Sequence, residues 1–309
     1  MTDSTDRRFL AGLLFGLAAA LIGGSWQVVT RQAVTTTLQP AELVWLRYGI
    51  PALLLLPLTW RSGLFPKPLA LHHAFFMLAG AGLPFGLVAM SGTRFAPAAH
   101  MGVLMAGASP LFASLLAWAL WRERPGAARA LGLLLMGAGV ALLGARSMAD
   151  FGSSQVWRGD ALLLLAALLW AGYTLAFRRS GLTPWQGAAL VNTWSVLLLL
   201  PAALLFDAVP RALFALPAAE LAWHALSQGV IAGVLGLWTF SAAIDRLGAA
   251  RAAAFGALAP VVSALGGWWW LGEALGLVDG LAVAAAVAGV ALASGALALR
   301  RRALADAVA

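Results

Sequence analysis

The chain has 309 residues, of which 62% are hydrophobic and only 10% are charged, and its mean hydropathy is +0.88. A soluble domain is nearer half apolar and about a quarter charged, so a water-soluble fold of this size could not bury so much apolar surface. The net charge is +8, but the basic residues punctuate apolar runs and form no patch, which argues against nucleic acid as a partner. Because there are no cysteines, disulfides, thiolate catalysis and cysteine-based metal sites are excluded.

Ten apolar stretches are each long enough to cross a bilayer core, which needs about 20 residues of helix. In chain order they cover residues 9–30, 41–60, 73–92, 97–121, 127–146, 159–177, 186–206, 221–243, 249–271 and 277–299. The first stretch is too long for the apolar part of a secretory signal, so we expect a retained helix. The sequence therefore predicts an all-α integral membrane protein with ten transmembrane helices.

The basic residues predict the orientation of these helices, because cytoplasmic loops carry an excess of Lys and Arg. With the N-terminus in the cytoplasm, 14 of the 20 basic residues fall inside and 5 outside, and Arg47 lies within the second stretch. The outer five are Arg31, Arg94, Arg146, Arg158 and Arg211. We therefore expect both termini in the cytoplasm.

The second half of the sequence repeats the first at a shift of about 150 residues. Pro110 falls on Pro260, Trp118 on Trp268, Glu123 on Glu273 and Gly126 on Gly276. We expect two five-helix repeats, at residues 1–148 and 149–309. Because five is odd, the second copy must enter the membrane upside down. Inverted repeats are typical of transporters, with the substrate site near the midplane between the copies. Since one chain carries both copies, we expect a functional monomer in the lipid bilayer.

The ends of the two repeats also carry a family resemblance. Residues 106–143 and 258–292 each have a proline in the fourth helix of the repeat, a glutamate at its end and a glycine-rich fifth helix. The whole chain resembles an EamA-type exporter of the drug/metabolite transporter superfamily, and among these the bacterial aromatic amino-acid exporters. It departs from the pattern at 122–124, where Arg-Glu-Arg replaces the Gly-Glu pair of 272–273. The resemblance implies export of small solutes, most of all amino acids, by alternating access in the bacterial inner membrane.

Prolines and small residues indicate how such helices would bend and pack. Proline removes a backbone hydrogen bond and invites a kink, so the repeat-related Pro110 and Pro260 are the hinge candidates, although static kinks would explain them equally well. Small residues in the fifth and tenth helices allow close packing and predict a supporting role away from the pathway. They are Gly132, Gly137, Gly139, Gly144, Gly280, Ala284, Gly289 and Gly295.

Aromatic residues deep in the spans are candidates for the substrate site. Trp26, Trp170 and Trp238 lie away from the span ends, and Trp26 and Tyr173 hold near-equivalent positions in the two repeats. Deep tryptophans can simply fill core volume. Their faces could also stack on an aromatic substrate or hold an ammonium group by cation–π attraction. We therefore predict a central aromatic-lined cavity.

Polar residues within spans complete the predicted substrate-binding set, because they are costly in lipid. Gln27 can donate and accept, Arg47 could attract a carboxylate, and Ser241 offers a hydroxyl. The alternative for Arg47 is an ion pair with Glu42, although a five-residue spacing is poor for it. His100, followed by Met105, could be a proton-linked gate or simply a hydrated residue near the membrane surface.

Other functional classes lack their characteristic residues. There is no phosphate-binding GxxxxGK[ST] loop, no histidine and carboxylate spacing typical of a metal site, and no acidic residue that reads as midspan. We expect no catalytic residues, metal or cofactor, so a membrane enzyme is a remote alternative. Export of lipophilic cations or other metabolites is the nearer one. The sequence leaves proton coupling and facilitated diffusion both open.

Overall fold

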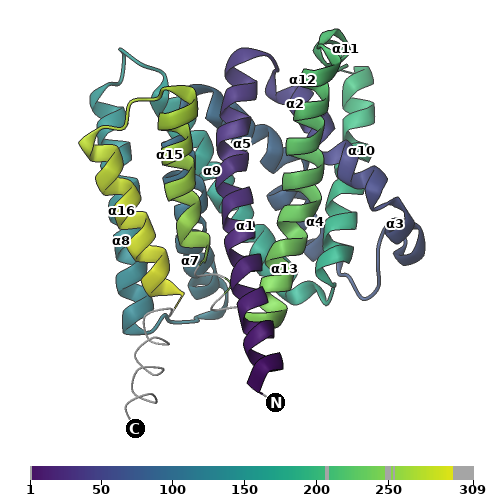
Figure 1. Cartoon of the computed structure of the whole chain (residues 1–309), viewed down its shortest axis with the longest axis horizontal. Coiled ribbons are helices and arrows are strands. Elements are labelled where there is room, and N and C mark those ends of the chain that lie inside the picture. Colours follow the sequence, from purple (N-terminus) through teal and green to yellow (C-terminus); the bar gives the residue numbers. More distant parts are fainter. Residues whose placement is uncertain (1, 206–208, 248–251, 253–254, 295–309) are drawn as a thin grey trace.

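The computed structural model describes residues 2–205, 209–247, 252 and 255–294, and within these ranges the regular secondary structure is helical. Helix α1 (Thr2–Thr36) begins at the lower end of the bundle in Figure 1 and passes to the upper end. We call the lower end the N-terminal side and the upper end the distal side. These two sides define the depth of every residue discussed below.

In the first half of the chain, seven helical segments lie between α1 and α8 (Ala127–Ala149). They are α2 (Pro40–Leu54), α3 (Leu56–Ser62), α4 (Leu71–Ala81), α5 (Leu83–Phe95), α6 (Ala98–His100), the π-helical η1 (Met101–Gly107) and α7 (Ser109–Trp121). Helix α8 then closes this half.

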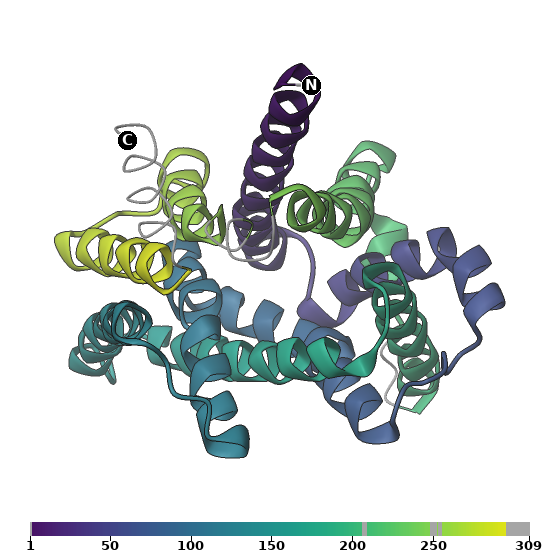
Figure 2. The ribbon, with the colours of Figure 1, turned by 90° about the horizontal axis from the view of Figure 1, so that it is seen from below.

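The second half follows with a similar pattern of long and broken helices. Its segments are α9 (Val156–Ser180), α10 (Pro184–Leu205), α11 (Arg211–Ala215), α12 (Ala218–His224), the π-helical η2 (Ala225–Leu235), α13 (Gly236–Leu247), the 3₁₀ turn η3 (Gly256–Leu258), α15 (Ala259–Leu271) and α16 (Leu277–Ala293). Helix α1 packs between α13 and α15 along one side of the bundle, as seen from below in Figure 2. On the other side α9 packs against α4 and α5.

The predicted class of fold agrees with this structure, whereas the count of ten spans is met only in part. Among the described residues, seven helices are long and apolar enough to cross a membrane, and eight if α2 and α3, bent by 62° to each other, form one span. Helix α16 is apolar but shorter, and α15 has 13 residues. Parts of three predicted stretches lie outside the described residues: the end of 186–206, the beginning of 249–271 and the end of 277–299.

Breaks inside spans are repaired by side chains from other helices. Between α4 and α5 the chain turns at Gly82, and Tyr48 on α2 donates from its hydroxyl to the carbonyls of Ala81 (3.1 Å) and Gly82 (2.6 Å). Ser195 on α10 accepts from the backbone N–H of Leu83 at 3.0 Å. Because an unpaired backbone group in lipid costs several kcal/mol, these contacts fix where the helix can break.

Among the described helices, α8 and α16 make the most extensive contact, and they meet through their small residues. A Cβ atom on Gly132 would lie 2.5 Å from the carbonyl oxygen of Gly289, and one on Gly139 would lie 2.9 Å from that of Ala282. The 150-residue shift places Gly132 on Ala282 and Gly139 on Gly289. The shift therefore maps each of these two contacts onto the other, as expected for copies related by a two-fold axis.

This packing predicts a position-dependent stability loss. Gly289→Leu would drive a side chain into the backbone of α8, and overpacking of this kind costs about 1–3 kcal/mol. Thermal unfolding in detergent should show a clear fall in the midpoint. Gly137→Leu on α8 is the matched control, because a Cβ there meets nothing within 4 Å. Equal midpoints for the two variants would contradict this account of the interface.

Candidate functional site

Three helices bring polar and aromatic side chains together around Trp26. The indole N–H of Trp26 on α1 donates to Oε1 of Gln228 on η2 at 2.7 Å, and the amide of Gln228 donates to the Thr30 hydroxyl at 3.1 Å. The Arg47 guanidinium on α2 lies over the Trp26 ring, 5.6 Å from its centroid. Trp26 lies ten residues before the end of α1, about 15 Å along the helix, which is near the middle of a bilayer core.

Arg47 has no acidic partner within the part of the chain that the structure describes. The alternative of an ion pair with Glu42 is not realised, because the Glu42 carboxylate accepts from the backbone N–H groups of Gln39 (2.9 Å) and Ala212 (3.0 Å). Arg47 is partly exposed and contacts the rings of Trp26 and Tyr48. A guanidinium offers five donors, so this residue presents unused hydrogen-bonding capacity inside the bundle.

The other predicted binding residues fall into separate places. Trp170 and Tyr173 on α9 form an aromatic row with Phe85 and Phe177, with ring centroids 5.1–5.9 Å apart. Trp238 on α13 instead contacts Phe15 of α1, 5.2 Å between centroids. The nine residues therefore do not form one continuous lining.

Four predicted residues remain, and they differ in surroundings. Gln27 is buried and its Oε1 atom has no hydrogen-bond partner among the described residues. Met105 on η1 belongs to the apolar core that Trp26 also packs against. Ser241 lies on α13, half-buried. His100 is buried in a charged cluster described next. Substrate binding by any of them stays a prediction.

Two buried acidic residues that the sequence analysis did not single out lie beside His100. Asp160 on α9 and Asp279 on α16 are each 5% exposed, and both lie beside His100, which is 4% exposed. His100 Nδ1 lies 2.7 Å from Asp160 Oδ1, and Nε2 lies 3.5 Å from Asp279 Oδ1. Each aspartate lies within a predicted stretch, 159–177 or 277–299, but close to its start and not at midspan. The structure places a carboxylate pair where none was expected.

The distal end of α6 is held by a second set of charges. Glu273, which follows α15, accepts from the Arg31 guanidinium at 2.8 Å and from the backbone N–H of Ala98 at 2.8 Å. Arg31 also donates to the carbonyls of Thr93 (2.7 Å) and Arg94 (2.8 Å). This network links α1, α5, α6 and the end of α15, and so closes the distal side of the bundle. The sequence analysis had placed Glu273 in the repeat without giving it a role.

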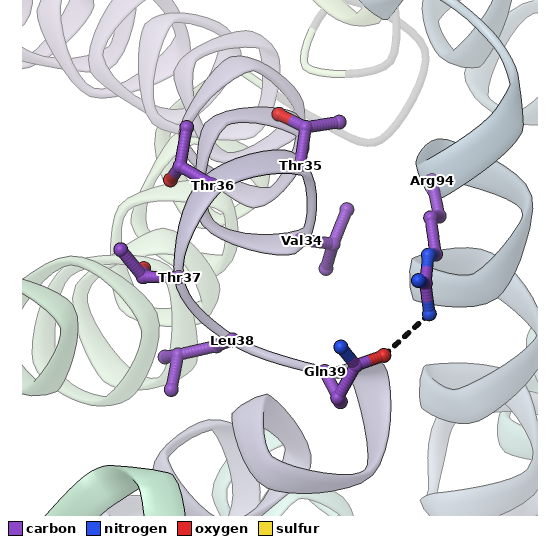
Figure 3. A pocket seen from close by; sticks show the side chains of 7 residues that line it. All are labelled: Val34, Thr35, Thr36, Thr37, Leu38, Gln39 and Arg94. Carbon is purple, nitrogen blue, oxygen red and sulfur yellow. Dashed lines mark hydrogen bonds between the residues drawn. The ribbon is translucent and has the colours of Figure 1, made fainter. Parts of the chain in front are cut away.

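Two surface hollows lie away from the predicted binding residues. One, of about 270 Å³, is at the distal turn between α1 and α2, where Arg94 donates to the Gln39 side chain (Figure 3). The other, of about 450 Å³, lies between α7 and α8 beside Trp118 and Arg124. Neither is lined by a predicted binding residue, so the central aromatic-lined cavity stays a prediction.

The hinge candidates occupy matching positions. Pro110 is the second residue of α7, just after the π-helical η1, and Pro260 is the second residue of α15, just after the 3₁₀ turn η3. In each span the irregular helical turns end just before the proline, and a regular α-helix begins there. Proline is tolerated in the first turn of a helix, because the N–H that it lacks would have no partner within the helix. Irregular helical turns often occur at functional sites.

Comparison with known proteins defines the class of this protein. The profile of the EamA-like transporter family matches residues 10–145 and 157–295, which is most of the chain and covers both repeats. The protein is therefore a multi-pass membrane transporter of small solutes. It belongs to the EamA-like transporter family.

The other comparisons concern the fold. One crystal structure matches with a TM-score of 0.61 and 24% sequence identity, over 94% of this chain and 98% of that one. That similarity extends to the fold alone. No curated protein matches the chain.

The distal network generates a prediction about accessibility. Glu273→Gln removes the charge that holds both Arg31 and Ala98, and a hydrogen bond to a charged group contributes about 1.5–3 kcal/mol. Since 1.4 kcal/mol is a factor of ten, the distal side should open about ten times more often. The native chain has no cysteine, so Thr93→Cys, buried behind Arg31, can be labelled with a thiol reagent without background.

The matched control is Glu123→Gln in the same Thr93→Cys background. Glu123 is the repeat counterpart of Glu273, is exposed, and makes no hydrogen bond or ion pair among the described residues. Labelling should be faster with Glu273→Gln and unchanged with Glu123→Gln. Equal labelling rates in both would show that the Glu273 network does not close this side.

Proposed function

We propose that this transporter exports amino acids, with aromatic or other large neutral side chains preferred, across a bacterial inner membrane. It works by alternating access as a monomer, and its N-terminal side faces the cytoplasm. The orientation is supported by the excess of basic residues on that side. We infer ten spans, with α15 and α16 completing the second repeat.

The observation that carries this proposal is the unpaired Arg47 beside Trp26. A cation within a membrane span normally pairs with an acid or with backbone carbonyls, and an intramembrane charge is a functional-site candidate by default. Here the nearby acid, Glu42, is occupied by two backbone N–H groups. The guanidinium can therefore take the substrate carboxylate in a charge-assisted hydrogen bond. With its carboxylate on Arg47, a bound amino acid would have its other groups close to the Trp26 ring and the Gln228 amide.

The two ends of the bundle support a cycle between two states. In this structure the distal side is held by Glu273 with Arg31 and Ala98. Glu123, the counterpart of Glu273 at the N-terminal side, makes no equivalent contact among the described residues. Inverted repeats supply two related conformations, so in the other state Glu123 would make the closing contacts and Glu273 would lose them. The hinges would be Pro110 and Pro260.

The alternative is export of lipophilic cations, and one observation favours it. The aromatic row of Phe85, Trp170, Tyr173 and Phe177 contains no charged residue of its own, and aromatic faces attract cations. Arg47 would repel such a solute. The two functions therefore predict opposite effects of removing this residue.

The test is flux of labelled phenylalanine into proteoliposomes, with unlabelled phenylalanine, tryptophan, threonine, lysine and methyl viologen as competitors. Phenylalanine and tryptophan should compete best. Arg47→Gln should raise the half-saturation concentration of phenylalanine by about 10–100-fold, because the lost bond to a charged group contributes about 1.5–3 kcal/mol.

Arg158→Gln is the matched control, since Arg158 also lies over a tryptophan ring, that of Trp157 at 5.4 Å, but at the start of α9. Its half-saturation concentration should equal that of the wild type. Saturable flux that is unchanged by Arg47→Gln would remove the carboxylate site. Uptake of methyl viologen alone, faster in Arg47→Gln, would establish the cation exporter instead.

A further inference from the structure

The cluster around His100 joins the two repeats through three buried ionisable side chains and the exposed Arg146. His100 and Arg146 come from the first repeat, and Asp160 and Asp279 from the second. Besides the two contacts of the imidazole ring, Arg146 donates to Asp279 Oδ2 at 2.6 Å, and the Ser147 hydroxyl donates to Asp160. The backbone N–H of Gly276 also donates to Asp279 Oδ2, at 2.8 Å. Oδ2 of Asp279 therefore accepts two hydrogen bonds, whereas Oδ1 accepts none among the described residues.

The hydrogen bonds of this cluster leave room for one proton. A neutral imidazole has a single N–H and can donate to only one of the two carboxylates that flank it. The buried Oδ1 of Asp279 has no hydrogen bond among the described residues. With neutral His100, the two aspartates and Arg146 carry a net charge of −1. One added proton makes the cluster neutral and gives each carboxylate an N–H partner.

Other charged groups near α6 lie outside the hydrogen-bonded cluster. At the start of α6, Arg31 and Glu273 pair with each other. Arg94 at the end of α5 donates to Gln39, and Arg158 at the start of α9 lies over Trp157; both side chains are exposed, so water and salt screen their charges. Helix α15, which packs against α6, has no ionisable residue within its bounds. The uncompensated charge therefore falls on the His100 cluster.

The cluster also lies on the element that closes the distal side. The Ala98 N–H is bound by Glu273 and its carbonyl by Ser263, two residues before His100. A movement of α6 that opens the distal side must therefore move the imidazole ring relative to Asp160 and Asp279. Trp26 of the proposed solute site packs against the same core as Met101 and Met105, just after His100.

We propose that His100, Asp160 and Asp279 bind one exchangeable proton, and that the carrier moves this proton inward for each solute that it exports. The proton adds to the free nitrogen of the imidazole ring from water on the distal side. It leaves to water on the N-terminal side after the conformational change. The coupling rests on the transport function proposed above, whereas the proton site stands on the cluster itself.

The first experiment tests the proton site without any substrate. Protein labelled with ¹⁵N-histidine in nanodiscs gives a signal for each of the four histidines, and the His100→Gln spectrum identifies the one from His100. We expect this signal to change between the neutral and the charged form, with the equivalent of one proton, across pH 4 to 10. A signal that keeps one form over the whole range overturns the proton site.

The second experiment tests coupling in proteoliposomes. With one proton per solute, a lumen one pH unit more acidic than the outside sustains up to a tenfold accumulation of labelled phenylalanine, or of methyl viologen if that is the solute carried. A pH dye in the lumen should report proton efflux when solute is added. Asp279→Asn should keep solute–solute exchange at equal pH, within about twofold, and lose the accumulation.

Glu42→Gln is the matched control, because Glu42 is a carboxylate at the same side whose hydrogen bonds among the described residues are to backbone N–H groups, and it should keep the accumulation. Wild-type exchange with neither accumulation nor proton efflux overturns the coupling and leaves the proposed function intact. Absence of exchange for every solute overturns the proposed function, while the histidine titration still decides the proton site. Because the wild-type measurements decide the outcome, a variant that fails to fold does not affect it.

Discussion

Inside a bilayer every backbone N–H and C=O must find its partner within the protein, and this constraint organises the structure. Long helices such as α1 and α9 satisfy it within themselves. The broken spans satisfy it through other helices: Tyr48 and Ser195 at the break before α5, Glu42 at the start of α11, and Glu273 at the start of α6. Each repair therefore also fixes how two distant helices pack.

The same constraint explains where the charges lie. Three of the acids, Glu42, Glu273 and Asp279, bind backbone N–H groups, so their positions are structural as well as electrostatic. Asp160 and Asp279 are buried against His100. Arg47 is the exception among the described charges deep in the bundle, because rings and no carboxylate surround it. Arg47, the proposed solute site, is therefore separate from the His100 cluster, the proposed proton site.

Much of the fold could be predicted from sequence, because lipid imposes long apolar runs and the repeat preserves Pro110 with Pro260 and Glu123 with Glu273. For the site, the sequence indicated which types of residue would take part but not which of them lie together. Arg47 and Trp26 were recognisable as unusual in an apolar span, but the bond from Trp26 to Gln228 joins residues 202 positions apart. Asp160 and Asp279 were not singled out, because acids near the start of a span are usually reached by water. Only helix packing reveals that they are buried.

The unpaired Arg47 also places a fixed charge inside the electric field of the membrane. Moving one elementary charge across the full potential changes the energy by about 2.3 kcal/mol per 100 mV. Any turn of α2 that carries the guanidinium along this field therefore makes the two conformations unequal in energy. A zwitterion has no net charge to add, so the voltage sensitivity of its passage would come from the protein and from the proton exchanged for it, and not from the solute.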